Sequence, residues 1–391
     1  MKNKKSFFKL IFLIAVVIHL LYYVSAHFTG WLNIFFENTT RGQDFFQIPN
    51  AAFSFIRGGS LQGELPPGVK PYTSCCAVNR NVYHPLFTLL IGIPLQLFSP
   101  WISFGIWATA HFIFSLITVY YLRRRFSDHK HLYLSLALYL LGSYHYYEIR
   151  GAQYHFLLTF FTLLMVYELA INKDNKKAGI YYFFTLLVKP VGLLWVVPLI
   201  IYRQFKTLAV GLGLYLLVSL PLILIPKGKY FFINLLGFIK TDLPFYNLIA
   251  IKHFLPIPVN FFNLMKVCLV VFLILYQIFR KPPLYYIIFL WISFQLLFYS
   301  FTFEYHYTIL SVFIAIGILL NYLSLSGIEI IPIIFLTLPT PIILLRLFFK
   351  APLILTLNQW AFTAVWSCFW LIFLDLIIFK KALLEQKTSI T

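Results

Sequence analysis

The sequence predicts an all-α polytopic membrane protein with about 12 transmembrane helices. Its 391 residues are 61% hydrophobic and 11% charged, whereas ordinary globular domains carry about 25% charged residues. Apolar runs of about 20 residues recur from end to end, and each is long enough to cross a hydrocarbon core of about 30 Å. Lysine and arginine cluster between these runs, so the positive-inside rule can orient each span.

The first predicted span covers residues 7–27 and follows Lys2, Lys4 and Lys5. This run is longer than the apolar region of a typical signal peptide, and it lacks a clear small-residue cleavage site. We therefore expect a retained span with a cytoplasmic N-terminus. Residues 28–100 then form the first extracytoplasmic loop.

The first extracytoplasmic loop contains two amphipathic segments, 44–57 and 83–98. The second segment is apolar but short, and it is interrupted by Pro85 and Pro94. Such segments are typical of helices that lie in the plane of the membrane interface. We therefore expect amphipathic interfacial helices in this loop.

The second span, 101–122, ends on Arg123-Arg124-Arg125, which the positive-inside rule places in the cytoplasm. Segment 179–202 is interrupted by Lys189-Pro190. As one span it would leave the basic residues that follow it on the outer side. We therefore expect two half-depth helices that meet at Lys189, because broken helices are tolerated where they line a cavity. The other expected spans are 132–147, 156–171, 207–225, 260–279, 285–301, 308–323, 330–349 and 353–379.

This topology places both termini inside. Residues 226–258 form a second large extracytoplasmic loop, and residues 1–391 form a single membrane domain. No internal repeat or low-complexity tail is visible in the sequence.

The formal net charge is +19. In a soluble protein this charge would suggest nucleic acid, but membrane proteins collect basic residues in cytoplasmic loops and at anionic lipid surfaces. We therefore expect no nucleic-acid partner. The outer loops are basic as well, with Arg41, Arg57, Lys70, Arg80, Lys227, Lys229, Lys240 and Lys252 against Glu37, Asp44, Glu64 and Asp242. This excess indicates either an anionic ligand, such as a lipid phosphate, or a solvated face that meets anionic headgroups.

The cysteines give no sign of a metal centre. Cys75 and Cys76 are adjacent in the first outer loop, as a strained vicinal disulfide or as free thiols. Cys268 and Cys368 fall inside predicted spans, where cysteine packs as a small apolar residue. No cysteine or histidine pairs fall at ligand spacing, so we expect no metal and no cofactor.

Asp44 is the leading catalytic candidate. Carboxylates are rare in this chain, and Asp44 stands alone beyond the first span, before an aromatic-rich stretch. A carboxylate at this place can take the proton of an acceptor hydroxyl when a group is transferred from a lipid-borne substrate. A lipid phosphate leaves as a stable anion, so its departure needs cations rather than an acid. The alternative for Asp44 is a helix N-cap for the segment that follows.

Lys189 lies between two apolar half-helices, where a lysine is unfavourable unless it faces water or a partner. We expect it either to contact a phosphate at the bottom of an outward-open cavity or to bond helix-end carbonyls as a structural residue. A second polar cluster lies at the outer ends of the third and fourth spans, as a substrate contact or as an interfacial ion pair. It consists of Glu148, Arg150, Gln153 and His155.

A late polar segment, Glu304-Tyr305-His306-Tyr307, lies at the outer end of a predicted span. Glu304 and His306 are two positions apart and could line one site, with His306 contacting phosphate or sugar. The alternative is an interfacial belt of aromatic and polar residues.

Several short motifs follow one another in a characteristic order. They are Asp44-Phe45-Phe46, Ala51-Ala52, Arg57-Gly58-Gly59, Tyr83-His84-Pro85-Leu86-Phe87, Gly151-Ala152-Gln153, Leu187-Val188-Lys189-Pro190 and Glu304-Tyr305-His306-Tyr307. In this order the chain resembles the GT-C superfamily of membrane glycosyltransferases. It is most similar to glycosyltransferase family 87, the polyprenyl-phosphate-mannose-dependent α-mannosyltransferase type. The resemblance covers about residues 40–310. His84 and Ala152 depart from the family's Tyr-Pro-Pro-Leu and Gly-Gln patterns.

The resemblance implies an inverting enzyme that transfers a hexose, mannose being favoured, from a polyprenyl-phosphate donor to an extracytoplasmic lipid or glycan acceptor. It implies a plasma (inner) membrane protein whose active site faces outward, with Asp44 as the catalytic base. The expected substrate-binding residues are Lys189, His306, Glu304, Arg57, Tyr83, His84, Gln153 and Arg150. Gln43 precedes Asp44 where some relatives carry paired acids and use a metal, so no obligatory metal is expected. We also expect a monomer in contact with membrane lipids.

Two other functions compete with the enzyme. A transporter or lipid flippase for an anionic lipid-linked sugar would be expected to show internal pseudo-symmetry, and no matching halves are visible in the sequence. A non-catalytic scaffold would have no use for the polar residues at membrane depth, which are unfavourable without a task.

Overall fold

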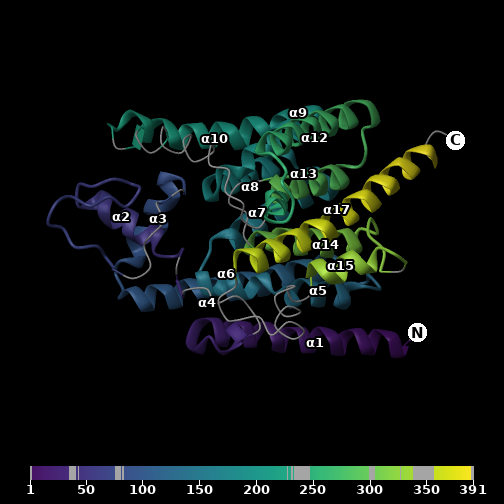
Figure 1. Ribbon diagram of the computed structural model, residues 1–391, viewed down its shortest axis with the longest axis horizontal. Coiled ribbons are helices and arrows are strands. Elements are labelled where there is room, and N and C mark those ends of the chain that lie inside the picture. The colour runs from purple at the N-terminus through teal and green to yellow at the C-terminus, as the bar shows by residue number, and fades with distance from the viewer. Residues whose placement is uncertain are drawn as a thin grey trace. The chain divides into compact units, whose positions relative to one another are not determined.

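The computed structural model describes residues 2–34, 41–42, 44–74, 81, 83–226, 228–229, 232, 247–298, 304–325, 327–337 and 356–388. These residues form helices, turns and loops, and no strand occurs among them (Figure 1). The predicted helical class is therefore confirmed. Contacts divide the chain into two compact units, which are described separately below.

Unit 1 comprises Met1–Asn38, Ser115–Tyr146 and Asp242–Thr391. Its helices and helical turns are α1 (Lys2–Val24), η1 (Ser25–Thr29), η2 (Trp31–Ile34), α5 (Leu132–Leu141), η5 (Leu248–His253), α12 (Val259–Arg280), α13 (Leu284–Phe298), η6 (Glu304–Tyr307), α14 (Thr308–Leu319), α15 (Ile330–Thr337) and α17 (Leu357–Thr388). α1 packs on α5, and the hydroxyl of Tyr22 donates to the carbonyl of Leu141 at 3.1 Å. The hydroxyl of Tyr285 in α13 donates to the carbonyl of Phe313 in α14 at 2.7 Å. Polar groups in this apolar unit thus find backbone partners on neighbouring helices.

Unit 2 comprises Thr39–Phe114 and Tyr147–Thr241. Its helices and helical turns are α2 (Gln47–Ile56), α3 (Pro85–Leu95), α7 (His155–Tyr167), η3 (Glu168–Asn172), α8 (Asn175–Val188), η4 (Pro190–Trp195), α9 (Val196–Ile201) and α10 (Phe205–Leu224). α4 (Pro100–Arg125) and α6 (Tyr144–Gly151) have residues in both units. α2 packs on α3, and α8 packs on both α7 and α10.

Six helices in the described parts of the chain are long and apolar enough to cross a membrane. They are Ser6–Thr29, Pro100–Arg125, His155–Asn172, Phe205–Leu224, Asn260–Arg280 and Asn358–Leu383. Shorter apolar helices accompany them. The protein is therefore a helical membrane protein. The number of about 12 spans, the GT-C architecture, the single membrane domain and the outer position of loops 28–100 and 226–258 stay predictions.

The two helices predicted in the first loop are present. α2 and α3 fall within the predicted segments 44–57 and 83–98. They approach closely at Gly92, where an added Cβ would lie 2.6 Å from the Cβ of Ala52. Their position at the membrane interface stays a prediction.

The predicted break at Lys189 is confirmed. α8 ends at Val188, and the backbone of Lys189 is extended, with φ −149° and ψ 138°. Pro190 then begins the 3-10 helix η4. A proline disfavours the helical conformation in the preceding residue and cannot donate a helical hydrogen bond. The Lys189-Pro190 pair therefore sets the break locally.

The predicted span 132–147 is wrong as a single helix. α5 ends at Leu141, Gly142 leaves the helical region at φ −53° and ψ 121°, and α6 begins at Tyr144. A Cβ on Gly142 would lie 2.5 Å from the ring of Tyr144. Only glycine admits this close approach, which explains why an apolar run that reads as continuous is divided here. Of the predicted span 330–349, only the part up to Thr337 lies within the described residues.

Candidate functional site

The loop that carries Asp44 is held against the end of α6 by backbone hydrogen bonds within unit 2. Gly42 N–H donates to the carbonyl of Arg150 at 2.8 Å. Asp44 and Phe45 both donate their N–H groups to the carbonyl of Gly151, at 3.3 and 3.2 Å. Gly42 adopts φ +71°, a conformation that favours glycine. The loop is therefore fixed by its backbone before any side chain contributes.

Buried aromatic residues beneath Asp44 hold the same loop. Phe45 is fully buried, and its ring stacks on Tyr154 with centroids 6.5 Å apart. The hydroxyl of Tyr154 donates to the carbonyl of Phe45 at 3.1 Å. Burial above all, and then electrostatic interaction with the neighbouring Tyr83 and Asp44 side chains, raises the pKa of Tyr154 well above its usual value. Tyr154 therefore keeps its proton and its role as a donor.

Arg41 anchors the start of this loop through its guanidinium group. The guanidinium carbon lies 4.7 Å from the ring centroid of Trp101 and 4.9 Å from that of Phe104. Both rings belong to α4. Such cation–π contacts contribute about 0.5–1 kcal/mol each at exposed sites and more when desolvated.

The carboxylate of Asp44 accepts hydrogen bonds from two amide side chains. Gln47 Nε2 donates to Oδ1 at 2.9 Å, and Gln153 Nε2 donates to Oδ2. Asp44 is half-buried. α2 begins at Gln47 with Phe46 as its N-cap, so the N-cap interpretation of Asp44 is wrong. The two amides orient the carboxylate without adding an opposing charge.

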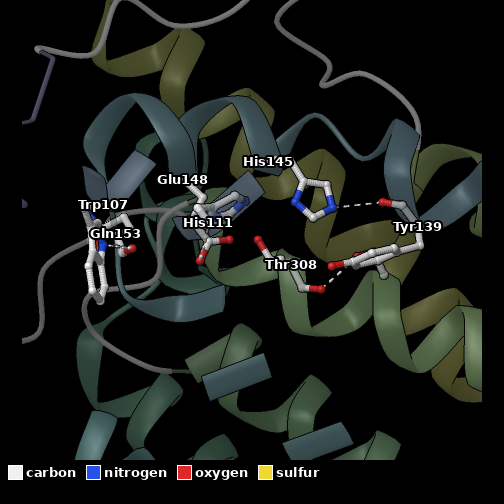
Figure 2. A network of polar contacts seen from close by, with 8 residues as sticks. Trp107, His111, Tyr139, His145, Glu148, Gln153 and Thr308 are labelled. Carbon is white, nitrogen blue, oxygen red and sulfur yellow. Dashed lines mark hydrogen bonds and ion pairs between the residues drawn. The ribbon is translucent and has the colours of Figure 1, made fainter. Parts of the chain in front are cut away.

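Gln153 is itself held by a turn after α6. Its N–H donates to the carbonyl of Glu148 at 2.9 Å, and its carbonyl accepts the indole N–H of Trp107 at 3.2 Å (Figure 2). Ala152 adopts φ +48°, which is uncommon for a residue with a Cβ. This left-handed residue turns the chain so that Gln153 meets the Asp44 loop.

Lys189 is buried, with 8% of its surface exposed. Its Nζ lies 2.6 Å from Nε2 of His155 and 5.8 Å from the ring centroid of Tyr83. Its backbone N–H donates to the carbonyl of Thr185 at 3.1 Å. The extended backbone at the break thus places an ammonium group among the side chains of unit 2.

The charges of Asp44 and Glu148 both act on Lys189. Glu148 is fully buried in α6, and its Oε1 lies 3.9 Å from Nδ1 of His111 in α4 (Figure 2). Buried ionisable groups are stable only when other charges or hydrogen bonds compensate them. Glutamate and histidine are also common metal ligands, so the expectation that no metal is required stays a prediction.

His84 has a structural position. Its Nδ1 accepts the N–H of Leu86 at 3.1 Å and so caps α3, which leaves Nε2 as the donor to Ser219 Oγ at 2.9 Å. Burial lowers the pKa of His84 to about 4, which keeps this ring neutral. Its predicted contact with substrate stays a prediction.

The other predicted residues divide between the two units. Tyr83 is buried in unit 2, with its ring centroid 4.8 Å from that of Tyr154. Arg57 is exposed at the end of α2, where its guanidinium carbon lies 5.4 Å from the ring centroid of Phe53. Unit 2 thus brings together Asp44, Gln153, Lys189, Tyr83 and the backbone of Arg150.

Two predicted substrate contacts belong to unit 1. His306 is buried in η6, and the side chain of Glu304 lies outside the described residues. Their predicted roles stay predictions. Gln43, Cys75, Cys76 and Arg80 also lie outside the described residues.

Three residues of this cluster were not predicted to belong to the site. Gln47 and Tyr154 contact Asp44 and Phe45 respectively, and His111 lies next to Glu148. His155, a member of the predicted polar cluster, contacts Lys189. In the sequence, His111 is a polar residue inside a long apolar span, and such residues often mark functional positions. No pattern in the sequence separates Gln47 from other polar residues of the first loop.

A scan against protein-family models finds no match to this chain, and a search of curated proteins finds none either.

Proposed function

We propose that this protein is an integral membrane glycosyltransferase. It transfers a hexose, mannose being the first choice, from a polyprenyl-phosphate donor to an extracytoplasmic lipid or glycan acceptor. The observation that carries the proposal is the half-buried carboxylate of Asp44, oriented by Gln47 and Gln153 on a rigid loop. The charge of Lys189 acts on the same carboxylate.

The chemistry needs one base and no acid. An ionised carboxylate offers about four lone-pair positions, and the two amides use one on each oxygen of Asp44. A carboxylate of this kind can also accept the hydrogen bond of an acceptor hydroxyl. As the hydroxyl oxygen bonds to the anomeric carbon, its proton passes to Asp44, and the bond from carbon to the phosphate oxygen breaks. A single displacement of this kind inverts the anomeric centre.

The leaving phosphate departs with the bonding electron pair and needs a cation. A fixed positive group in a site of low polarity stabilises developing negative charge far more than it does in water. Lys189 supplies such a group in the proposed mechanism. Its place in unit 2 and the electrostatic attraction between its ammonium group and the Asp44 carboxylate support this assignment.

In this proposal, the identities of the sugar and of the lipid carrier are inferred from the order of the sequence motifs. The apolar helices add support, because a lipid-linked donor is reached most directly by a protein embedded in the same membrane. Asp44, Gln153 and Lys189 belong to three separate motifs of that series, and all three lie in unit 2.

The proposal is tested by mass spectrometry of envelope glycolipids and glycans from a deletion strain. The strain is complemented with the wild type or with Asp44→Asn, which keeps the shape of the side chain and removes the base. We expect one species to lose a single hexose on deletion, to return with the wild type and to stay absent with Asp44→Asn at equal protein level. Full rescue by Asp44→Asn would exclude Asp44 as the base. An unchanged glycan profile after deletion would favour the transporter.

A further inference from the structure

A short hydrogen bond joins the buried pair of Lys189 and His155, and its direction depends on the charge of the lysine. Lys189 Nζ lies 2.6 Å from His155 Nε2, and the two residues are 8% and 1% exposed. An ammonium group has three donors and no acceptor. With Lys189 charged, Nε2 of His155 must therefore be the acceptor, and the ring proton lies on Nδ1. A doubly protonated His155 could not make this contact.

Two influences decide the charge of Lys189. Burial disfavours the ammonium form, whereas the charges of Asp44 and Glu148 favour it. Two carboxylates in a buried region are themselves unfavourable without a compensating cation. The charged lysine beside a neutral histidine is therefore the arrangement that compensates the charges of this cluster best.

One short segment positions both the base and the cation. In the turn before α7, Gln153 donates to the carboxylate of Asp44 and Tyr154 donates to the carbonyl of Phe45. Nε2 of His155, the first residue of α7, lies 2.6 Å from Lys189 Nζ. A rigid segment of three residues thus fixes two groups that belong to separate parts of the chain.

We propose that His155 is a positioning residue, which aims the ammonium group of Lys189 at the phosphate of the lipid-linked donor. This inference rests on the proposed function. A neutral imidazole can orient an ammonium without cancelling its charge, whereas a carboxylate at the same place would form an ion pair and reduce the attraction for phosphate. The ring of Tyr83, 5.8 Å from Nζ, covers another side of the ammonium group. Histidine at position 155 thereby leaves Lys189 both oriented and positive.

The test measures binding rather than transfer. The purified full-length protein in detergent is titrated with geranylgeranyl phosphate and, separately, with the uncharged alcohol geranylgeraniol. His155→Leu removes the acceptor, and His155→Gln retains a side-chain carbonyl that can accept from Lys189. Thermal unfolding and size-exclusion profiles establish that each variant is folded.

We expect His155→Leu to raise the Kd for the phosphate by about tenfold or more, because a hydrogen bond to a charged group is lost. The Kd for the alcohol should stay unchanged, and His155→Gln should bind the phosphate within about threefold of the wild type. A folded His155→Leu protein that binds the phosphate like the wild type would overturn the proposal. So would an equal loss of phosphate and alcohol binding, or a wild type that does not prefer the phosphate.

The same titration separates this inference from the proposed function. Asp44→Asn should bind the phosphate even though it transfers no sugar. A wild-type protein that binds the phosphate through His155 and Lys189 but transfers no sugar would refute the glycosyltransferase and leave the role of His155 intact.

Discussion

At the scale of single residues, the proposed chemistry depends on how one carboxylate is held. Asp44 accepts from Gln47, three positions later in the chain, and from Gln153, which is far away in sequence. The two donors differ in what holds them. Gln47 begins a helix, whereas Gln153 is fixed at its N–H by Glu148 and at its carbonyl by Trp107. Gln153 is therefore held by contacts with two other segments, whereas Gln47 is held by its own helix.

Replacing Gln153 should impair transfer more than it impairs folding. Gln153→Leu keeps the size of the side chain and removes the donor to Asp44, so the base loses its fixed direction. A hydrogen bond to a charged group contributes about 1.5–3 kcal/mol, so the transfer rate should fall roughly 10- to 100-fold. Rates on a polyprenyl-phosphate donor, measured beside thermal unfolding, check this. A wild-type rate in Gln153→Leu would remove Gln153 from the site.

The sequence predicted part of this cluster and missed part of it. Asp44 and Lys189 stand out because a charge in an apolar chain is rarely placed without a reason. Gln153 was found through a motif. Gln47 was not selected, because no pattern separates it from the other polar residues of the first loop. His155 was selected only as a member of a polar cluster, because its contact with Lys189 joins distant segments and leaves no local pattern in composition or spacing.

At the scale of secondary-structure elements, glycines determine how closely membrane helices pack. In α8 and α10, Gly179 and Gly211 face the neighbouring helix: an added Cβ on Gly179 would lie 2.6 Å from Val210, and one on Gly211 would overlap the ring of Tyr182. Small residues allow helices in a membrane to approach and gain packing energy. At Gly213, further along α10, an added Cβ would meet nothing within 4 Å among the described residues outside its own stretch of helix.

Gly211 and Gly213, both in α10, offer a matched pair of variants. Gly211→Leu should lower the thermal stability of the detergent-solubilised protein, because overpacking at a close helix contact costs about 1–3 kcal/mol. Gly213→Leu places the same side chain on the same helix in open space and should change the melting temperature little. Equal melting temperatures for the two variants would contradict the packing of α8 on α10.

Local sequence patterns predicted one of two helix breaks and missed the other. The Lys189-Pro190 break was correctly predicted because proline acts on its immediate neighbours. The break at Gly142 was missed because a single glycine in an apolar run is compatible with a continuous helix. In the structure the ring of Tyr144 lies within 2.5 Å of the place that a Cβ on Gly142 would take.

At the scale of the whole molecule, the long apolar helices make this a membrane protein. Their orientation rests on the positive-inside rule, with Lys2, Lys4 and Lys5 before the first span and Arg123-Arg124-Arg125 after the second. The rule predicts that Asp44 lies on the extracytoplasmic side. The proposed function requires this orientation, because its acceptor is extracytoplasmic.

The orientation is checked by cysteine labelling in intact cells. Lys70→Cys and Ser127→Cys are both exposed positions, placed in a background without the four native cysteines. A membrane-impermeant maleimide should label position 70 in intact cells and position 127 only after permeabilisation. The reverse pattern would place Asp44 in the cytoplasm and exclude an extracytoplasmic acceptor.

Sugar transfer by the purified protein in liposomes tests the role of Asp44 most directly. The donor is a polyprenyl-phosphate hexose with a labelled sugar, and the acceptors come from an extract of the native envelope. We expect the wild type to form a labelled, anomerically inverted product. Asp44→Asn, folded and inserted equally well, should be at least about 100-fold slower. Transfer by Asp44→Asn at the wild-type rate would contradict the assignment of Asp44 as the base.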